Sequence, residues 1–171
     1  IGWTKSQSQT GKLEIAGLLG PVPDIDTLKI NAPGLTAHGD VTLKPSGGLD
    51  RLRLHRLSVG NWLDVPVDLI GQGAGRPVQV IIKGGSLDLR RARFGKTKPS
   101  GVASPPMRVA LDRLQVTDTI ALTDMTGEFD VARGLDGQFS AALNGGTAVS
   151  GRVVPRNGRS AVQLTATDAG G

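Results

Sequence analysis

The residues that could do chemistry in this chain are few, and none of them forms a complete catalytic or nucleotide-binding motif. Gly95-Lys96-Thr97 resembles the end of a phosphate-binding loop, but that motif needs a glycine where Arg90 stands and a helix directly afterwards. Pro99, followed by Ser-Gly, opposes a prompt helix and excludes the motif. The stretch Gly84-Gly85-Ser86-Leu87-Asp88 lacks the closing glycine of a serine nucleophile elbow.

Metal and acid–base sites are poorly supported as well. The chain has no cysteine and two histidines, His38 and His55, each on the polar side of an alternating stretch, so zinc is not expected. Asp24 and Asp26 are too few carboxylates for a calcium loop. The glycine-rich stretch 71–77 predicts a turn, because no helix N-terminus follows it to bind phosphate. We therefore expect no enzyme activity, no metal and no cofactor.

A run of cations between residues 90 and 98 has two interpretations. It contains no acidic residue and consists of Arg90, Arg91, Arg93, Lys96 and Lys98. The three arginines could contact lipid headgroups. A charged strand end that discourages edge-to-edge pairing explains the run equally simply. Nucleic acid is not expected as a partner, because aromatic residues for base stacking make up 3% of the chain.

The elements that must position these residues are strands. Residues 35–45 place Leu35, Val41 and Leu43 on one side and His38 on the other, and similar period-two alternation recurs through most of the chain. Turn signals at 33–34, 46–48, 71–75, 84–85 and 145–146 separate the alternating runs. Asn157-Gly158 predicts a tight hairpin. The sequence therefore predicts an all-β chain of ten or more strands in a mainly antiparallel sheet.

One slip interrupts this alternation. Leu52 and Leu54 keep one phase, whereas the apolar residues that follow keep the opposite phase: Leu57, Val59, Leu63, Val65, Val67 and Leu69. One extra residue in a strand reverses the face that each later side chain takes. The slip near Arg56 therefore predicts a bulge or bend.

Length and composition indicate one β domain over residues 1–171, with a flexible loop at about 95–106. The 171 residues include 25 glycines and 10 prolines but no tyrosine, and the net charge is +5. The sequence begins Ile-Gly-Trp and contains no signal peptide and no apolar run long enough to span a bilayer. We expect it to be a fragment of a longer protein.

Two architectures satisfy the pattern. In the first, one long curved sheet forms an open groove with an accessible apolar face. In the second, two sheets close on each other as a β-sandwich with a dry core.

Three stretches resemble proteins of the AsmA-like superfamily, which includes YhdP-like and TamB-like members. They are "KINAPGLTAHGDVTLKPSGGLDRLRLHRLSVGNWLDVPVDLIGQG" at 29–73, "GGSLDLRRARFG" at 84–95 and "NGGTAVSGRVVPRNGRSAVQLTATDAGG" at 144–171. Strands of the form apolar–small–Gly–x–Val–x–Leu, followed by Lys-Pro or Pro-x-Asn-Gly turns, are typical of such proteins. Within this superfamily, the chain resembles the C-terminal region of YhdP-like proteins.

The resemblance implies the periplasmic part of a bacterial protein anchored in the inner membrane, with the anchor outside this fragment. It implies a non-enzymatic β-groove that helps phospholipid move between the inner and outer membranes. The partners would be phospholipid acyl chains, the remainder of the same polypeptide and other envelope proteins. The rival hypothesis is a structural module that assists outer-membrane protein assembly through an exposed strand edge. The groove would be lined by Leu35, Val41, Leu43, Leu52, Leu54, Leu63, Val65, Val67, Leu69, Val109, Leu111, Phe129 and Phe139.

Overall fold

A computed structural model describes residues 10–18, 20–92, 106–132, 134–156 and 159–166 of the chain. The described residues form twelve strands and no helix, as predicted. The strands are β1 (Lys12–Leu18), β2 (Asp24–Ala32), β3 (Leu35–Leu43), β4 (Leu49–Val59), β5 (Leu63–Ile70), β6 (Gln79–Lys83), β7 (Ser86–Asp88), β8 (Met107–Gln115), β9 (Ala121–Asp130), β10 (Asp136–Leu143), β11 (Thr147–Arg156) and β12 (Arg159–Ala166).

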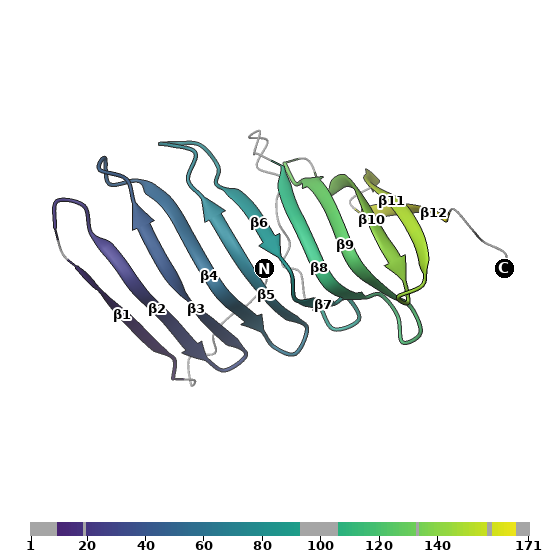
Figure 1. Ribbon diagram of the computed structural model, residues 1–171, viewed down its shortest axis with the longest axis horizontal. Coiled ribbons are helices and arrows are strands. Elements are labelled where there is room, and N and C mark those ends of the chain that lie inside the picture. The colour runs from purple at the N-terminus through teal and green to yellow at the C-terminus, as the bar shows by residue number, and fades with distance from the viewer. Residues whose placement is uncertain (1–9, 19, 93–105, 133, 157–158, 167–171) are drawn as a thin grey trace.

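All twelve strands belong to one twisted and curved sheet (Figure 1). They follow each other in chain order from β1 to β12 and pair antiparallel, with one exception in the middle. There, β6 and β7 together occupy the place between β5 and β8, and both run parallel to β8. The described strands therefore form the single curved sheet of the first architecture and not the two packed sheets of a sandwich.

The predicted bulge is present in β4. Leu54 pairs with Val67 and Leu57 pairs with Val65, so β4 contains one residue more than β5 over this interval. Pro66 lies on β5 directly opposite the bulge. A proline has no N–H for the ladder and is tolerated in an inner strand where a bulge already interrupts the pairing. The bulge in β4 therefore explains both the change of phase in the alternation near Arg56 and the presence of Pro66 in an inner strand.

Similar irregularities continue across the sheet in line with this bulge. Between β6 and β7, the backbone of Gly85 has a φ of 83°, and a Cβ there would lie 2.2 Å from the carbonyl oxygen of Asp64. Farther along, β9 has one residue more than β10 near Asp124, whose φ is 50°. Asp112, on β8 between them, accepts a hydrogen bond from the Gly85 N–H at 2.8 Å. The irregularities form one transverse line from β4 to β9.

The predicted turns separate the strands as expected. Gly34, with a φ of 74°, closes the two-residue turn between β2 and β3. Asn144 and Gly145 both have positive φ in the turn between β10 and β11. Arg156 pairs with Arg159 across β11 and β12, as a hairpin at Asn157-Gly158 requires, although these two residues lie outside the described ones. Of the predicted loop at 95–106, residues 95–105 also lie outside them.

The pairing register divides the sheet into two unlike faces. Residues directly opposite each other on neighbouring strands point to the same side. One side, here called the apolar face, carries a continuous hydrophobic cluster that extends from β2 to β11. The opposite side, here called the polar face, carries the charged residues of the paired strands. Within the described part of the chain, no helix is long and apolar enough to cross a bilayer.

Candidate functional site

All thirteen positions predicted to line a groove lie on the apolar face. Strand pairing places them on one side of the sheet, because residues directly opposite each other share a face. Examples are the pairs Leu35↔Val59, Leu54↔Val67, Ile82↔Val109 and Phe139↔Gly151. Eight of the thirteen belong to the buried hydrophobic cluster: Leu54, Leu63, Val65, Val67, Val109, Leu111, Phe129 and Phe139. Sequence alternation was the signal that found them.

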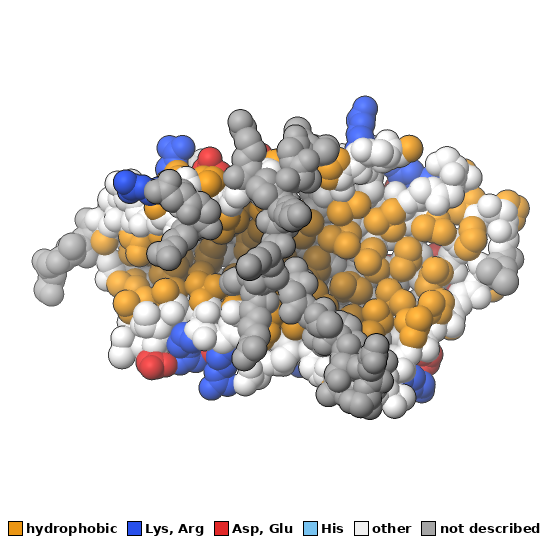
Figure 2. Space-filling view, turned by 180° about the vertical axis from the view of Figure 1, so that it is seen from behind, with side chains coloured by type: hydrophobic (Ala, Val, Ile, Leu, Met, Phe, Trp, Pro, Cys, Tyr) orange, Lys and Arg blue, Asp and Glu red, His pale blue; other side chains and the backbone are white. Residues whose placement is uncertain are grey.

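The apolar face carries no charged side chain at any described position that strand pairing assigns to it. Figure 2 shows the result as a hydrophobic band that crosses the molecule, with charged side chains along its margins. Because leucine, valine, isoleucine, alanine, methionine and phenylalanine supply most of the band, its chemistry is that of a hydrocarbon surface. Such a surface can bind apolar groups by burying them.

Exposure of this face increases from the centre of the sheet to both edges. Val65 on β5 is 1% exposed, whereas Leu13 on β1 is 61% exposed and Leu164 on β12 is 53% exposed. Both edge strands therefore present apolar side chains to solvent. The backbone edges of β1 and β12 are also unpaired with any described strand.

Two aromatic rings lie flat against glycines on the apolar face. A Cβ on Gly151 would stand 2.3 Å from Cζ of Phe139, and a Cβ on Gly137 would stand 2.6 Å from Cδ1 of Phe129. The two ring centroids are 6.5 Å apart in a stacked arrangement. Sequence analysis identified both phenylalanines but missed their glycine partners. The available signal was that each glycine occupies the apolar phase of an alternating strand.

The polar face contains one buried charge among the described residues, Asp68 on β5. Its carboxylate accepts hydrogen bonds from Arg51 on β4 and from Lys83 Nζ, the latter at 2.7 Å. Burial acts to raise the pKa of Asp68, but the hydrogen bonds and charges of Lys83 and Arg51 outweigh it, and the pKa is lowered. This ion-pair cluster ties three neighbouring strands together.

The two histidines also lie on the polar side. His55, which is left unpaired with β3 at the β4 bulge, has its Nε2 2.9 Å from Oδ1 of Asp40. The His38 ring is 5.7 Å from the His55 ring. Within the described ranges, no group of three or more His, Cys, Asp or Glu side chains is arranged to hold a metal ion.

The basic run does not present free cations where the structure describes it. The Arg90 guanidinium donates to both carboxylate oxygens of Asp88, at 2.8 and 2.6 Å, and to Asp118. Arg91 lies 3.8 Å from Asp88. The hydrogen bonds from Arg90 hold the pKa of Asp88 below its ordinary value. Headgroup contact by Arg90 would have to compete with these partners, and Arg93 lies outside the described residues.

Comparison with known proteins adds no relative to this picture. No known protein-family model, no curated protein and no solved structure matches the chain.

Proposed function

We propose that the apolar face holds the acyl chains of phospholipids and serves lipid transfer without catalysis. One observation carries the proposal: a hydrophobic cluster extends from β2 to β11 on one face of a single sheet, and no described position that strand pairing assigns to this face is charged. Its visible parts are orange in Figure 2. Each methylene removed from water contributes roughly 0.8 kcal/mol, so such a band binds lipid tails without specific contacts.

Several features of the sheet suit transfer rather than storage. The band is spread over many strands, so a tail can move between equivalent positions instead of sitting in one deep pocket. Its exposed ends at β1 and β12 offer places where a tail enters and leaves. We further propose, on the sequence resemblance alone, that this occurs in the bacterial periplasm between the two membranes, as part of an AsmA-like protein anchored in the inner membrane.

Native mass spectrometry of the 171-residue chain, combined with lipid extraction after incubation with phosphatidylethanolamine–phosphatidylglycerol vesicles, tests the proposal. Leu164→Asp puts a charge on the exposed part of the apolar face, and Gln163→Asp puts the same charge on the polar face one residue away. A carboxylate that keeps two methylenes in water costs about 1.6 kcal/mol. We therefore expect Leu164→Asp to weaken lipid binding about tenfold or more and Gln163→Asp to leave it unchanged.

The second candidate function is a structural module that pairs with other envelope proteins. It is favoured by the two sheet edges, which no described strand pairs with, because an extended segment of a partner can add a strand to β1 or β12. A folded chain that takes up no lipid from vesicles would contradict the first proposal and favour this one.

A further inference from the structure

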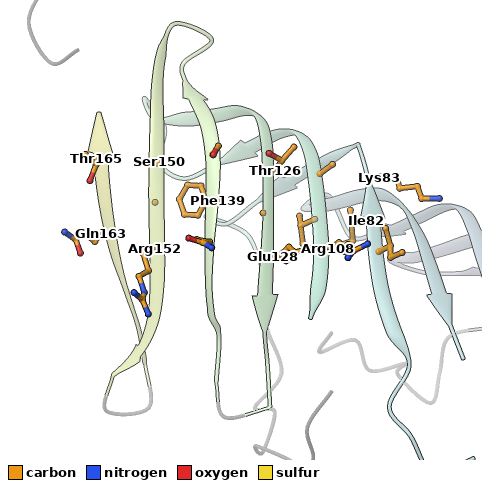
Figure 3. A pocket seen from close by; sticks show the side chains of 17 residues that line it. Ile82, Lys83, Arg108, Thr126, Glu128, Phe139, Ser150, Arg152, Gln163 and Thr165 are labelled. Carbon is orange, nitrogen blue, oxygen red and sulfur yellow. Dashed lines mark hydrogen bonds and ion pairs between the residues drawn. The ribbon is translucent and has the colours of Figure 1, made fainter. Parts of the chain in front are cut away.

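The polar face is hollowed in the C-terminal half of the sheet. Strands β6 and β8 to β12 line an open cavity of about 780 Å³ (Figure 3). Its polar and charged lining residues pair with one another across neighbouring strands, as in Arg108↔Glu128 and Ser140↔Ser150. The hollow is therefore on the side of the sheet opposite the apolar face, and it is independent of the lipid proposal.

Two registered rows of polar side chains cross this hollow. The first is a row of hydroxyls on four adjacent strands, Thr126, Ser140, Ser150 and Thr165. The second contains charged and amide groups on five adjacent strands, Arg108, Glu128, Gln138, Arg152 and Gln163. Every one of these nine residues is exposed. Neighbouring strands are about 4.8 Å apart, so the second row extends over about 19 Å.

Most of these groups have hydrogen-bonding capacity left for a ligand. Arg108 Nε donates to Glu128 Oε1 at 2.9 Å, and Lys83 at the rim pairs with Asp68. Arg152, by contrast, forms no ion pair with any residue that the structure describes. The lining of the hollow contains three cations, Lys83, Arg108 and Arg152, and one anion, Glu128. A ligand that supplies negative charge near Arg152 would complement this surface.

The one aromatic residue among the described ones that line the hollow is Phe139 (Figure 3). The Phe139 ring packs against Gly151 on the apolar side of the sheet, so it does not present a stacking surface here. A nucleobase would find no ring to stack on. Hydroxyls, amides and an arginine instead suit a ligand recognised by hydrogen bonds and charge.

We propose that this hollow binds an extended acidic glycan. One pyranose unit in an extended glycan has a length close to the spacing between strands, so successive sugars lie over successive members of the two rows. Their hydroxyl groups exchange hydrogen bonds with the serine, threonine and glutamine side chains. Arg152 pairs with an acidic substituent, for which its planar guanidinium supplies two parallel donors.

Tetragalacturonate is a suitable probe, with the neutral tetrasaccharide cellotetraose as its comparison. Binding to the whole chain would be followed by NMR titration of backbone amides. We expect shifts concentrated on β8 to β12 with tetragalacturonate and much weaker binding of cellotetraose. Arg152→Gln should weaken tetragalacturonate binding about tenfold, the effect of removing a charge-assisted hydrogen bond. Arg156→Gln, which changes the same strand and face two pleats away, should leave it unchanged.

Three results would overturn the proposal. They are the absence of tetragalacturonate binding, equal binding of cellotetraose, and an equal loss in Arg152→Gln and Arg156→Gln, which would indicate general attraction to a basic surface. Because Arg152 and Arg156 are both exposed, folding of either variant is expected and is checked by its amide spectrum.

Discussion

Replacing Gly151 with alanine adds one methyl group to the apolar face, and the structure predicts that this methyl destabilises the protein. The new Cβ would lie 2.3 Å from Cζ and 2.5 Å from Cε1 of Phe139, whereas comfortable carbon–carbon contacts are about 3.5–4.0 Å. The Phe139 side chain is buried, so it has little room to move away. We expect Gly151→Ala to lower the free energy of unfolding by about 1–3 kcal/mol, the usual cost of overpacking.

Whether Gly151→Ala lowers or raises the free energy of unfolding is the informative result. Where space and backbone conformation permit, glycine to alanine stabilises by about 0.4–1 kcal/mol, because the unfolded chain loses freedom. Gly48 provides the matched control, since a Cβ there would meet no atom within 4 Å. Urea denaturation followed by far-ultraviolet circular dichroism should therefore show a loss for Gly151→Ala and none for Gly48→Ala.

Making the same Gly151→Ala substitution in a Phe139→Leu protein tests whether the Phe139 ring causes the loss of stability. Phe139→Leu removes the atoms that the new methyl would meet, so Gly151→Ala should cost less than about 0.5 kcal/mol in that background, and the two substitutions should be strongly coupled. A Gly151→Ala protein as stable as the parent, or one with the same loss in both backgrounds, would refute the close packing of Phe139 on Gly151.

Two further predictions concern other parts of the sheet. Because the pKa of Asp68 is lowered by folding, its ion pairs stabilise the protein above the unfolded carboxyl value of about 3.9, and that stability is lost as the pH falls through the folded-state pKa. In urea denaturation at pH 7, Asp68→Asn should lower the free energy of unfolding by about 2 kcal/mol. The difference in unfolding free energy between this variant and the parent should become smaller below pH 4, and a difference that does not change with pH would contradict the ion-pair role. Gly85→Ala should lower the melting temperature clearly, because of the positive φ and the approach to Asp64, and an unchanged melting temperature would contradict the described backbone conformation at Gly85.

Much of this fold follows from local features of the sequence. Period-two alternation predicts the strands and the face on which each apolar side chain lies, since successive side chains of a strand point to opposite sides. The change of phase near Arg56 predicts the bulge of β4 from the same rule, and positive-φ glycines mark several of the turns.

Other features depend on which strands become neighbours, and alternation carries no information about that. The parallel pairing of β6 and β7 with β8 is one example. The packing of Phe139 on Gly151 is another, because it requires the register of β10 against β11. Asp118, a partner of Arg90, is 28 residues away from it, so the basic run looks unpaired in the sequence although its first member is not.

The bulge in β4 links the irregularity in the sequence to the proposed use of the sheet. If β4 paired regularly, without the bulge, the alternation would carry Leu57 and Val59 to the polar face and bring Ser58 to the apolar one. The hydrophobic band would then stop at β4. Because the bulge absorbs one residue, Leu54 and Leu57 lie on the same side, opposite Val67 and Val65. The transverse line of irregularities up to β9 has the same consequence, since Leu111 and Leu114 of β8, three residues apart, are both buried in the one cluster. The proposed movement of an acyl chain along this face would need such continuity more than regular pairing, and the line of irregularities maintains it.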